Sequence, residues 1–227
     1  MDHLVRLAAE CVGTFCVCTV AILAAAGVGT GDAGWIVAAL AYGLAVTGVM
    51  QACGGPAPVH VNPAVTLAVF TAGRGGVARS LCRVAGQLVG AGLAGLVVMW
   101  LLAGAGTALG MPAGQFTHAD ASRTIAVEAL LGFVWGAAYV GAVHGRNAAG
   151  AAVAVGLTVA AGSLAGAAFT GGDMNPARAI ASAVAAVDFS TLWMYATAPL
   201  AGGAVAGLVT RLLLPPDGGT ADPAARL

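Results

Sequence analysis

Charged residues are scarce in this chain. Asp, Glu, Lys and Arg make up 8% of its 227 residues, whereas a soluble domain carries roughly 25%. Lysine is absent, so all nine basic side chains are arginine. The formal net charge is zero, and nothing in the composition points to a nucleic-acid partner. This scarcity of charge excludes an ordinary soluble fold.

The patterns of metal and disulfide chemistry are also missing. No CxxC pair and no Cys/His cluster with metal-ligand spacing occurs in the sequence. The cysteines lie within or beside apolar segments, which favours buried free thiols. They are Cys11, Cys16, Cys18, Cys53 and Cys82. The sequence therefore calls for no metal and no cofactor.

Long apolar blocks take the place of charge. Hydrophobic residues make up 59% of the chain, and their blocks are too long for alternating strands. Backbone groups in lipid must be satisfied within a segment, so these blocks indicate membrane-spanning α-helices. The 35 glycines, together with alanine, allow such helices to approach closely.

Six apolar segments are long enough to cross a hydrocarbon layer of ~30 Å. They are about Leu4–Val28, Trp35–Gly54, Ser80–Gly104, Ser122–Val143, Ala148–Ala168 and Thr191–Leu213. Two shorter segments, Pro63–Thr71 and Pro176–Ala186, would reach only ~15 Å as helices. A helix of that length can dip halfway into a membrane and turn back.

Both short segments start with the same triplet. Asn62-Pro63-Ala64 and Asn175-Pro176-Ala177 lie 175 − 62 = 113 residues apart, about half of the chain. Asn caps free N–H groups at a helix start, and Pro suits the first helical turn. Two such starts in two apolar halves indicate an inverted repeat, in which broken helices meet at the middle of the membrane.

Other parts of the chain repeat with nearly the same offset. Leu88–Val97 resembles Leu200–Val209, with an offset of 200 − 88 = 112 residues. Three spans per half is an odd number, so the second half must be inverted relative to the first. We expect a first repeat over residues 1–110, a second over 111–215, and a flexible cytoplasmic tail over 216–227.

Together with the triplets, four residues carry a family resemblance: Glu10 in span one, Glu128 in span four, His60 before the first triplet and Arg178 after the second. With them the chain resembles the aquaporin, or major intrinsic protein, family over about residues 4–213. The resemblance implies an all-α membrane protein with six transmembrane helices and two re-entrant half-helices in an inverted repeat. It also implies a passive channel rather than an enzyme, with one pore per subunit of a homotetramer.

The triplets suggest how such a pore works. If the half-helices meet end to end, Asn62 and Asn175 each turn an amide NH₂ toward a passing water or hydroxyl compound. Both positive helix ends converge there and oppose cations and protons. Capping alone is the alternative role for the two asparagines, and it is compatible with pore lining.

Glu10 and Glu128 have two readings. We favour buried carboxylates that accept backbone N–H bonds from the loops before the half-helices, which is the family's use of them; an ion relay is the alternative. His60 is expected to pack near the cytoplasmic vestibule, with pH sensing as the other possibility.

By resemblance, a selectivity filter is formed by Tyr42, Ser163, Gly172 and Arg178. Ser163 is small and Gly172 has no side chain, so we expect a wider opening than in a strict water channel. This favours small neutral solutes such as glycerol or metalloid hydroxides as well as water, closer to nodulin-26-like members.

Arg178 is a charged residue within the membrane, and its role has two possible interpretations. Such charges are costly and usually functional, but a structural salt bridge to Asp173 or Asp188 is the alternative to a filter role. Asp173 could pair with Arg178 and weaken cation exclusion, or face away from the pore, and we favour the second.

Arginine placement predicts the orientation. With both termini cytoplasmic, seven arginines fall inside and only Arg123 falls in an outer loop. The inner ones are Arg6, Arg74, Arg79, Arg83, Arg146, Arg211 and Arg226. We therefore expect a multi-pass protein of the inner or plasma membrane, with the lipid bilayer, water and small neutral solutes as its partners.

Three other functions compete with this reading. The first is a strictly water-selective aquaporin. An ion-coupled secondary transporter also uses inverted repeats and broken helices, but spans two, three, five and six lack the residues expected of a coupling site. An intramembrane hydrolase could recruit Ser163, His60 and Asp173, yet no nucleophile motif surrounds Ser163.

Overall fold

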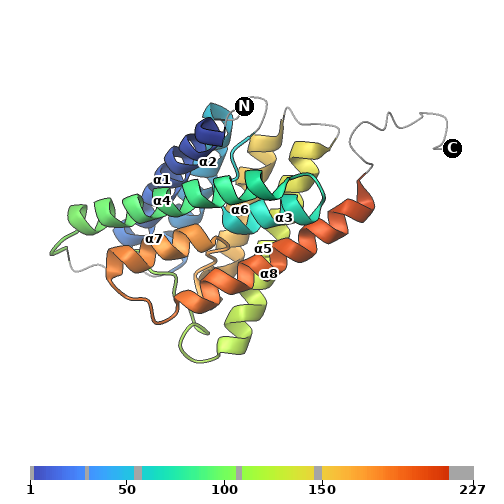
Figure 1. Ribbon diagram of the computed structural model, residues 1–227. Coiled ribbons are helices and arrows are strands. Elements are labelled where there is room, and N and C mark those ends of the chain that lie inside the picture. The colour runs from blue at the N-terminus through green and yellow to red at the C-terminus, as the bar shows by residue number, and fades with distance from the viewer. Residues whose placement is uncertain (1–2, 29–30, 54–57, 106–108, 146–149, 215–227) are drawn as a thin grey trace, which may run out of the picture.

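The computed structural model describes residues 3–28, 31–53, 58–105, 109–145 and 150–214. These parts of the chain contain eight helices and no strand (Figure 1). The helices are α1 (His3–Gly27), α2 (Asp32–Ala52), α3 (Pro63–Thr71), α4 (Val77–Leu101), α5 (Ala121–His144), α6 (Ala151–Thr170), α7 (Pro176–Ala186) and α8 (Leu192–Leu213). The expected tail at 216–227, together with Arg146 and Arg226, lies outside the described residues.

The all-α fold predicted from the sequence is confirmed. Within the described residues, six helices are long and apolar enough to cross a membrane, and each overlaps one of the predicted spans. The two short predicted helices coincide with α3 and α7. Asn62 and Asn175 are their N-caps, and each is followed by a proline in the first turn, so local sequence sets where both helices begin.

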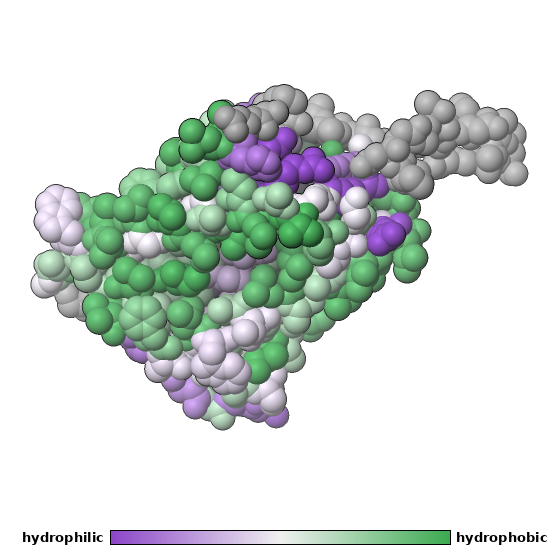
Figure 2. Space-filling model, in the orientation of Figure 1, coloured by the Kyte–Doolittle hydropathy of each residue, from purple (hydrophilic) through white to green (hydrophobic). Residues whose placement is uncertain are grey.

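The outer faces of the long helices are apolar. Leu44 on α2, Leu130 on α5 and Leu157 on α6 are each more than 60% exposed. Figure 2 shows hydrophobic side chains over much of the visible face, with hydrophilic ones gathered toward its upper and lower ends. An apolar surface of this extent suits lipid rather than water, so the chain is a multi-pass membrane protein.

The long helices pack in corresponding pairs. In the first half α1 packs against α4, and in the second half α5 packs against α8. Each short helix rests on a long helix of the other half, since α3 packs against α8 and α7 packs against α4. The two halves are therefore interlocked, and the N-terminal ends of α3 and α7 meet between them.

Glycines allow the paired helices to touch through their backbones. A Cβ added at Gly90 of α4 would lie 2.2 Å from the carbonyl oxygen of Cys11 in α1. One added at Gly202 of α8 would lie 1.9 Å from the carbonyl oxygen of Ala129 in α5. Close backbone approach of this kind drives helix association in lipid, where burial of apolar surface contributes little.

We predict that Gly202→Val lowers the melting temperature of the detergent-solubilised protein by about 5 °C or more, because the added side chain forces α5 and α8 apart. Gly92→Val is the matched control, since a Cβ at Gly92 meets nothing within 4 Å. The protein is heated to a series of temperatures, and size-exclusion chromatography measures the folded fraction that remains at each. Equal melting temperatures for the two variants would show that the contact of α5 with α8 is not tight.

Candidate functional site

The two triplets form mirrored caps at the centre of the molecule. The Ala64 N–H donates to Asn62 Oδ1 at 2.8 Å, and the Ala177 N–H donates to Asn175 Oδ1 at 3.0 Å. Both asparagine side chains are fully buried. Capping therefore occupies the oxygen of each amide and leaves its NH₂ group for other partners.

Each NH₂ group reaches across to the opposite half. Asn62 Nδ2 donates to the Met174 carbonyl at 3.0 Å, and Asn175 Nδ2 donates to the Val61 carbonyl, also at 3.0 Å. These two bonds join the starts of α3 and α7. An amide NH₂ carries two hydrogens, so each crossing bond uses one of the two N–H groups of its asparagine.

The residues before both asparagines have an unusual backbone. Val61 has φ of 49° and Met174 has φ of 60°, the left-handed region that non-glycine residues seldom occupy. For the β-branched Val61 this conformation is strained. It turns the Val61 and Met174 carbonyls toward the asparagine of the other half, so the strain positions the crossing bonds.

Glu10, on α1, holds the first strained loop. Its carboxylate accepts the N–H groups of His60 and Val61, both at 2.8 Å. Gln87 of α4 donates to the same carboxylate at 2.9 Å, and Arg83 of α4 forms an ion pair with it. The fully buried charge of Glu10 is thus compensated by a cation and by several donors, as burial of a carboxylate requires.

Glu128, on α5, holds the second strained loop. It accepts the N–H groups of Asp173 at 3.1 Å and Met174 at 2.7 Å, together with the hydroxyl of Thr170 at 2.7 Å. No cation pairs with Glu128 among the described residues, in contrast to the ion pair of Glu10 with Arg83. The two loops are therefore held by equivalent carboxylates in unequal electrostatic surroundings.

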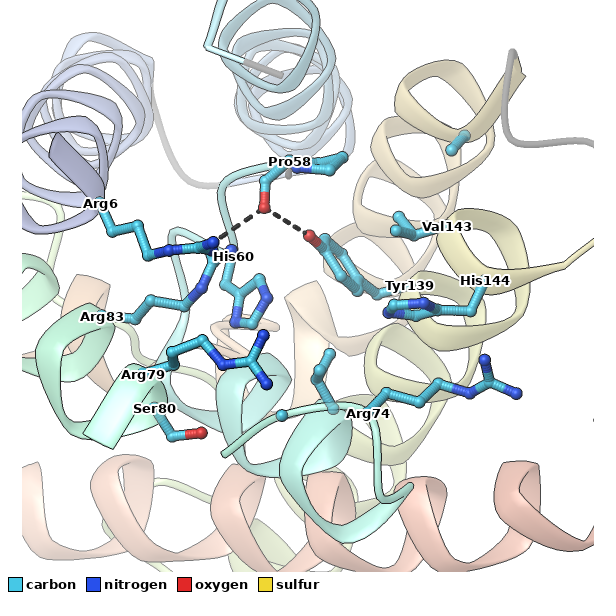
Figure 3. Close-up of a pocket in the computed structure, with 13 residues that line it drawn as sticks. Arg6, Pro58, His60, Arg74, Arg79, Ser80, Arg83, Tyr139, Val143 and His144 are labelled. Atoms are coloured by element: carbon cyan, nitrogen blue, oxygen red, sulfur yellow. Dashed lines mark hydrogen bonds between the residues drawn. The ribbon is translucent and has the colours of Figure 1, made fainter. Parts of the chain in front are cut away.

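His60 faces a cavity of about 460 Å³, which we call the arginine vestibule. The His60 ring bonds through Nδ1 to the Thr66 hydroxyl at 3.0 Å and packs edge-on against Tyr139. Figure 3 shows the Pro58 carbonyl in the same cavity, accepting from Arg83 at 3.1 Å and from the Tyr139 hydroxyl at 3.0 Å. This loop is therefore tied to α4 and α5 directly before the first triplet.

A second cavity, of about 170 Å³, contains three of the four expected filter residues. Tyr42, Ser163 and Arg178 line it, and we call it the filter cavity. Gly172 is not in its wall: it packs behind Ser163, where a Cβ would lie 2.4 Å from the Ser163 carbonyl oxygen, and its φ is +59°. The neighbouring Gly171 lines the cavity instead.

Asp173 takes the pairing role that the sequence analysis considered and did not favour. It forms an ion pair with Arg178, with Nη1 and Oδ1 at 2.6 Å, and it does not itself line the filter cavity. A fully buried carboxylate needs a compensating cation, and Arg178 in the first turn of α7 is within reach. Asp188, the other partner considered, instead accepts the N–H of Ser190.

Tyr42 completes the group around Arg178. The Arg178 guanidinium lies over the Tyr42 ring, 5.2 Å from its centroid, and the Tyr42 hydroxyl donates to the Asp173 carbonyl at 3.3 Å. Among the described residues, two buried atoms of the ion pair, Arg178 Nε and Asp173 Oδ2, have no hydrogen-bond partner. Arg178 lines the filter cavity, whereas Asp173 does not.

Sequence reasoning missed the residues that hold the first loop from α4. Arg83 and Gln87 lie one helical turn apart in an apolar span, and both bind Glu10. A charged residue inside a span is itself a signal, because it needs a buried partner. The left-handed conformations of Val61 and Met174 have no such signal, since neither residue type favours them.

Comparison with known proteins places this geometry in a family. The family model described as "Major intrinsic protein" matches residues 1–210. The lens fiber major intrinsic protein of Oryctolagus cuniculus is 36% identical over 184 residues, which covers 78% of this chain and 69% of the relative. Aquaporin TIP4-4 of Zea mays is 39% identical over 200 residues, covering 84% and 77%.

A solved structure shows the same fold. The aquaglyceroporin from Plasmodium falciparum superposes with a TM-score of 0.80, covering 92% of this chain and 96% of that one at 20% sequence identity. The family match over residues 1–210 and the similarity to the two relatives agree with this fold. This chain belongs to the major intrinsic protein family, whose members are membrane channels and not enzymes.

Proposed function

We propose that this protein is a passive channel that conducts water and small uncharged solutes and excludes ions and protons. The observation that carries the proposal is the pair of buried asparagines, whose amide NH₂ groups meet where α3 and α7 begin and have more donor capacity than the crossing bonds use. Neutral hydrogen-bonding molecules can replace their hydration by such contacts, and ions cannot do so as well.

Two cavities support a path through this pair. Arg6 lines the arginine vestibule and Ala25 lines the filter cavity. Both residues lie on α1, 25 − 6 = 19 residues apart, which corresponds to about 28 Å along a helix. The two cavities therefore open at opposite ends of the molecule. His60 in one and Arg178 in the other flank the two triplets.

Exclusion of cations follows from the direction of the short helices. The N-terminal ends of α3 and α7 meet at the asparagine pair, and each carries a partial positive charge. Arg178 adds a cation at the filter cavity, although Asp173 compensates part of its charge. We infer that the helix ends supply the main barrier to cations, and Arg178 a smaller share.

The orientation and the assembly are parts of the same proposal. Arg6, Arg74, Arg79 and Arg83 gather at one end of the molecule, and Arg123 lies at the other, which supports cytoplasmic termini. The equivalent packing of α4 on α1 and of α8 on α5 supports two inverted repeats over residues 1–110 and 111–215. A homotetramer in the inner or plasma membrane remains a prediction from the family resemblance.

We expect proteoliposomes containing the protein to change volume much faster than empty vesicles, both when an osmotic gradient drives water across the membrane and when a glycerol gradient is imposed. The rate should not change when Na⁺ or proton gradients are imposed, because no coupling ion is involved. Stopped-flow light scattering measures both quantities. Rates equal to those of empty vesicles would refute the channel, whereas dependence on an ion gradient would indicate a secondary transporter.

The width of the filter cavity predicts a size effect. Ser163→His should lower glycerol permeability more than water permeability, by roughly tenfold against a few-fold, because the larger ring narrows the cavity that Tyr42 and Arg178 share. The comparison uses both solutes in the same vesicle preparation. Ser190→His is the control, since Ser190 is exposed. Equal losses of water and glycerol permeability would place Ser163 outside the constriction. A wild-type protein that conducts water but no glycerol would be a strictly water-selective channel.

The Asp173–Arg178 ion pair predicts coupled stability. Asp173→Asn and Arg178→Gln should each lower the melting temperature by about 5 °C, because each leaves a buried partner uncompensated. The double variant should lose clearly less than the sum of the two. Asp120→Asn, at the exposed ion pair with Arg123, should change little. Additive losses at Asp173 and Arg178 would show that the pair is not coupled.

A further inference from the structure

The arginine vestibule has a composition that conduction of neutral solutes does not require. Its basic lining residues are Arg6, Arg74, Arg79, Arg83, His60 and His144. Figure 3 shows three of the arginines on one side of the cavity and Tyr139 with His144 on the other, with His60 between them. These residues come from α1, α4, α5 and the loops on either side of α3, so the basic group is assembled only by the fold.

The charge of the vestibule is mostly of one sign. Arg83 is paired with Glu10, which lies beneath the cavity and does not line it. None of the residues that line the cavity in the described part of the chain is acidic. Arg79 is exposed and Arg6 is half-buried, so both guanidinium groups can reach a ligand in the cavity. An anion there would meet several guanidinium groups at once.

Backbone groups add to this positive potential. Helix α4 begins after Gly76 and α6 after Gly150, and neither N-cap residue supplies a side-chain acceptor. Gly75 and Ser80 at the start of α4, and Ala151 at the start of α6, line the vestibule. The first N–H groups of a helix have no partner within it, and together with the helix dipole they favour an anion.

We propose that the arginine vestibule binds a phosphate-bearing anion, and that the bound anion obstructs the passage to the asparagine pair. Guanidinium groups pair with phosphate oxygens in a forked geometry, which favours phosphate over a halide. The cavity of about 460 Å³ has room for a phosphate or a diphosphate with part of its hydration.

Obstruction follows from the position of the cavity floor. His60, two residues before Asn62, lines the vestibule, as does Val69 of α3. A solute that moves between this end of the molecule and Asn62 must cross the same space. The binding of the anion stands by itself, whereas the obstruction rests on the proposed channel function.

The binding is tested by isothermal titration of the full-length detergent-solubilised protein with inorganic diphosphate, in a phosphate-free buffer of low ionic strength. We expect one site whose affinity weakens at least tenfold in the double variant Arg6→Gln/Arg79→Gln and falls as salt is added. Arg123→Gln is the matched control, because Arg123 is paired with Asp120 outside both cavities, and it should bind as the wild type does. Absence of binding, or equal losses in the control and the double variant, would overturn the site.

The obstruction is tested in proteoliposomes of neutral phosphatidylcholine with diphosphate on both sides of the membrane. Water permeability of the wild type should fall severalfold at saturating diphosphate, and that of the double variant should not. In vesicles that also contain phosphatidic acid, permeability that is already low and insensitive to diphosphate would assign the site to a lipid phosphate. Inhibition as large as in neutral vesicles would assign it to a soluble anion.

The titration and the vesicle experiment together distinguish this inference from the proposed function. Specific diphosphate binding without any conduction would leave the site standing and refute the channel. Conduction that diphosphate does not change, in neutral and in acidic vesicles alike, would refute the obstruction and retain the channel.

Discussion

Two buried carboxylates determine the geometry at the centre of this protein. Glu10 and Glu128 accept the N–H groups of the loops before α3 and α7, and so hold Val61 and Met174 in a strained left-handed backbone. That backbone turns two carbonyls toward the opposite asparagine, and the crossing bonds follow. The short helices alone could not stay end to end, because their like-signed helix ends repel each other. The proposed pore therefore depends on two carboxylates that need not touch the solute.

The two ends of the proposed path differ in their electrostatics. At the filter cavity Arg178 is stacked on Tyr42 and paired with Asp173, so its charge is held in place and partly compensated. At the arginine vestibule several guanidinium groups face one space, and one of them, that of Arg83, is paired with the carboxylate of Glu10. The first arrangement suits a neutral solute that needs donors and acceptors together. The second attracts anions, which is why the two cavities are assigned different ligands.

Much of the fold could be predicted because it depends on local physics. Segment length and apolar composition determine the six spans, and the Asn-Pro starts determine α3 and α7. The position of Asp173 could not be predicted in the same way. Whether its side chain meets Arg178 depends on how the loop before α7 is folded against α5, and Glu128 decides that fold from 45 residues away in sequence. In the sequence Arg83 indicates only the orientation, and its contact with Glu10 appears only when α4 packs on α1.

The sequence by itself determined that this is an α-helical membrane protein with two half-length helices that begin at identical triplets, because hydropathy and helix caps act over a few neighbouring residues. Only the tertiary structure decided what those triplets and charges contact. Hydrogen bonds and ion pairs in a dry interior depend on which helices approach, and glycines such as Gly90 and Gly202 set that approach. The ion pair at the filter cavity and the gathering of arginines at the vestibule are both consequences of that packing.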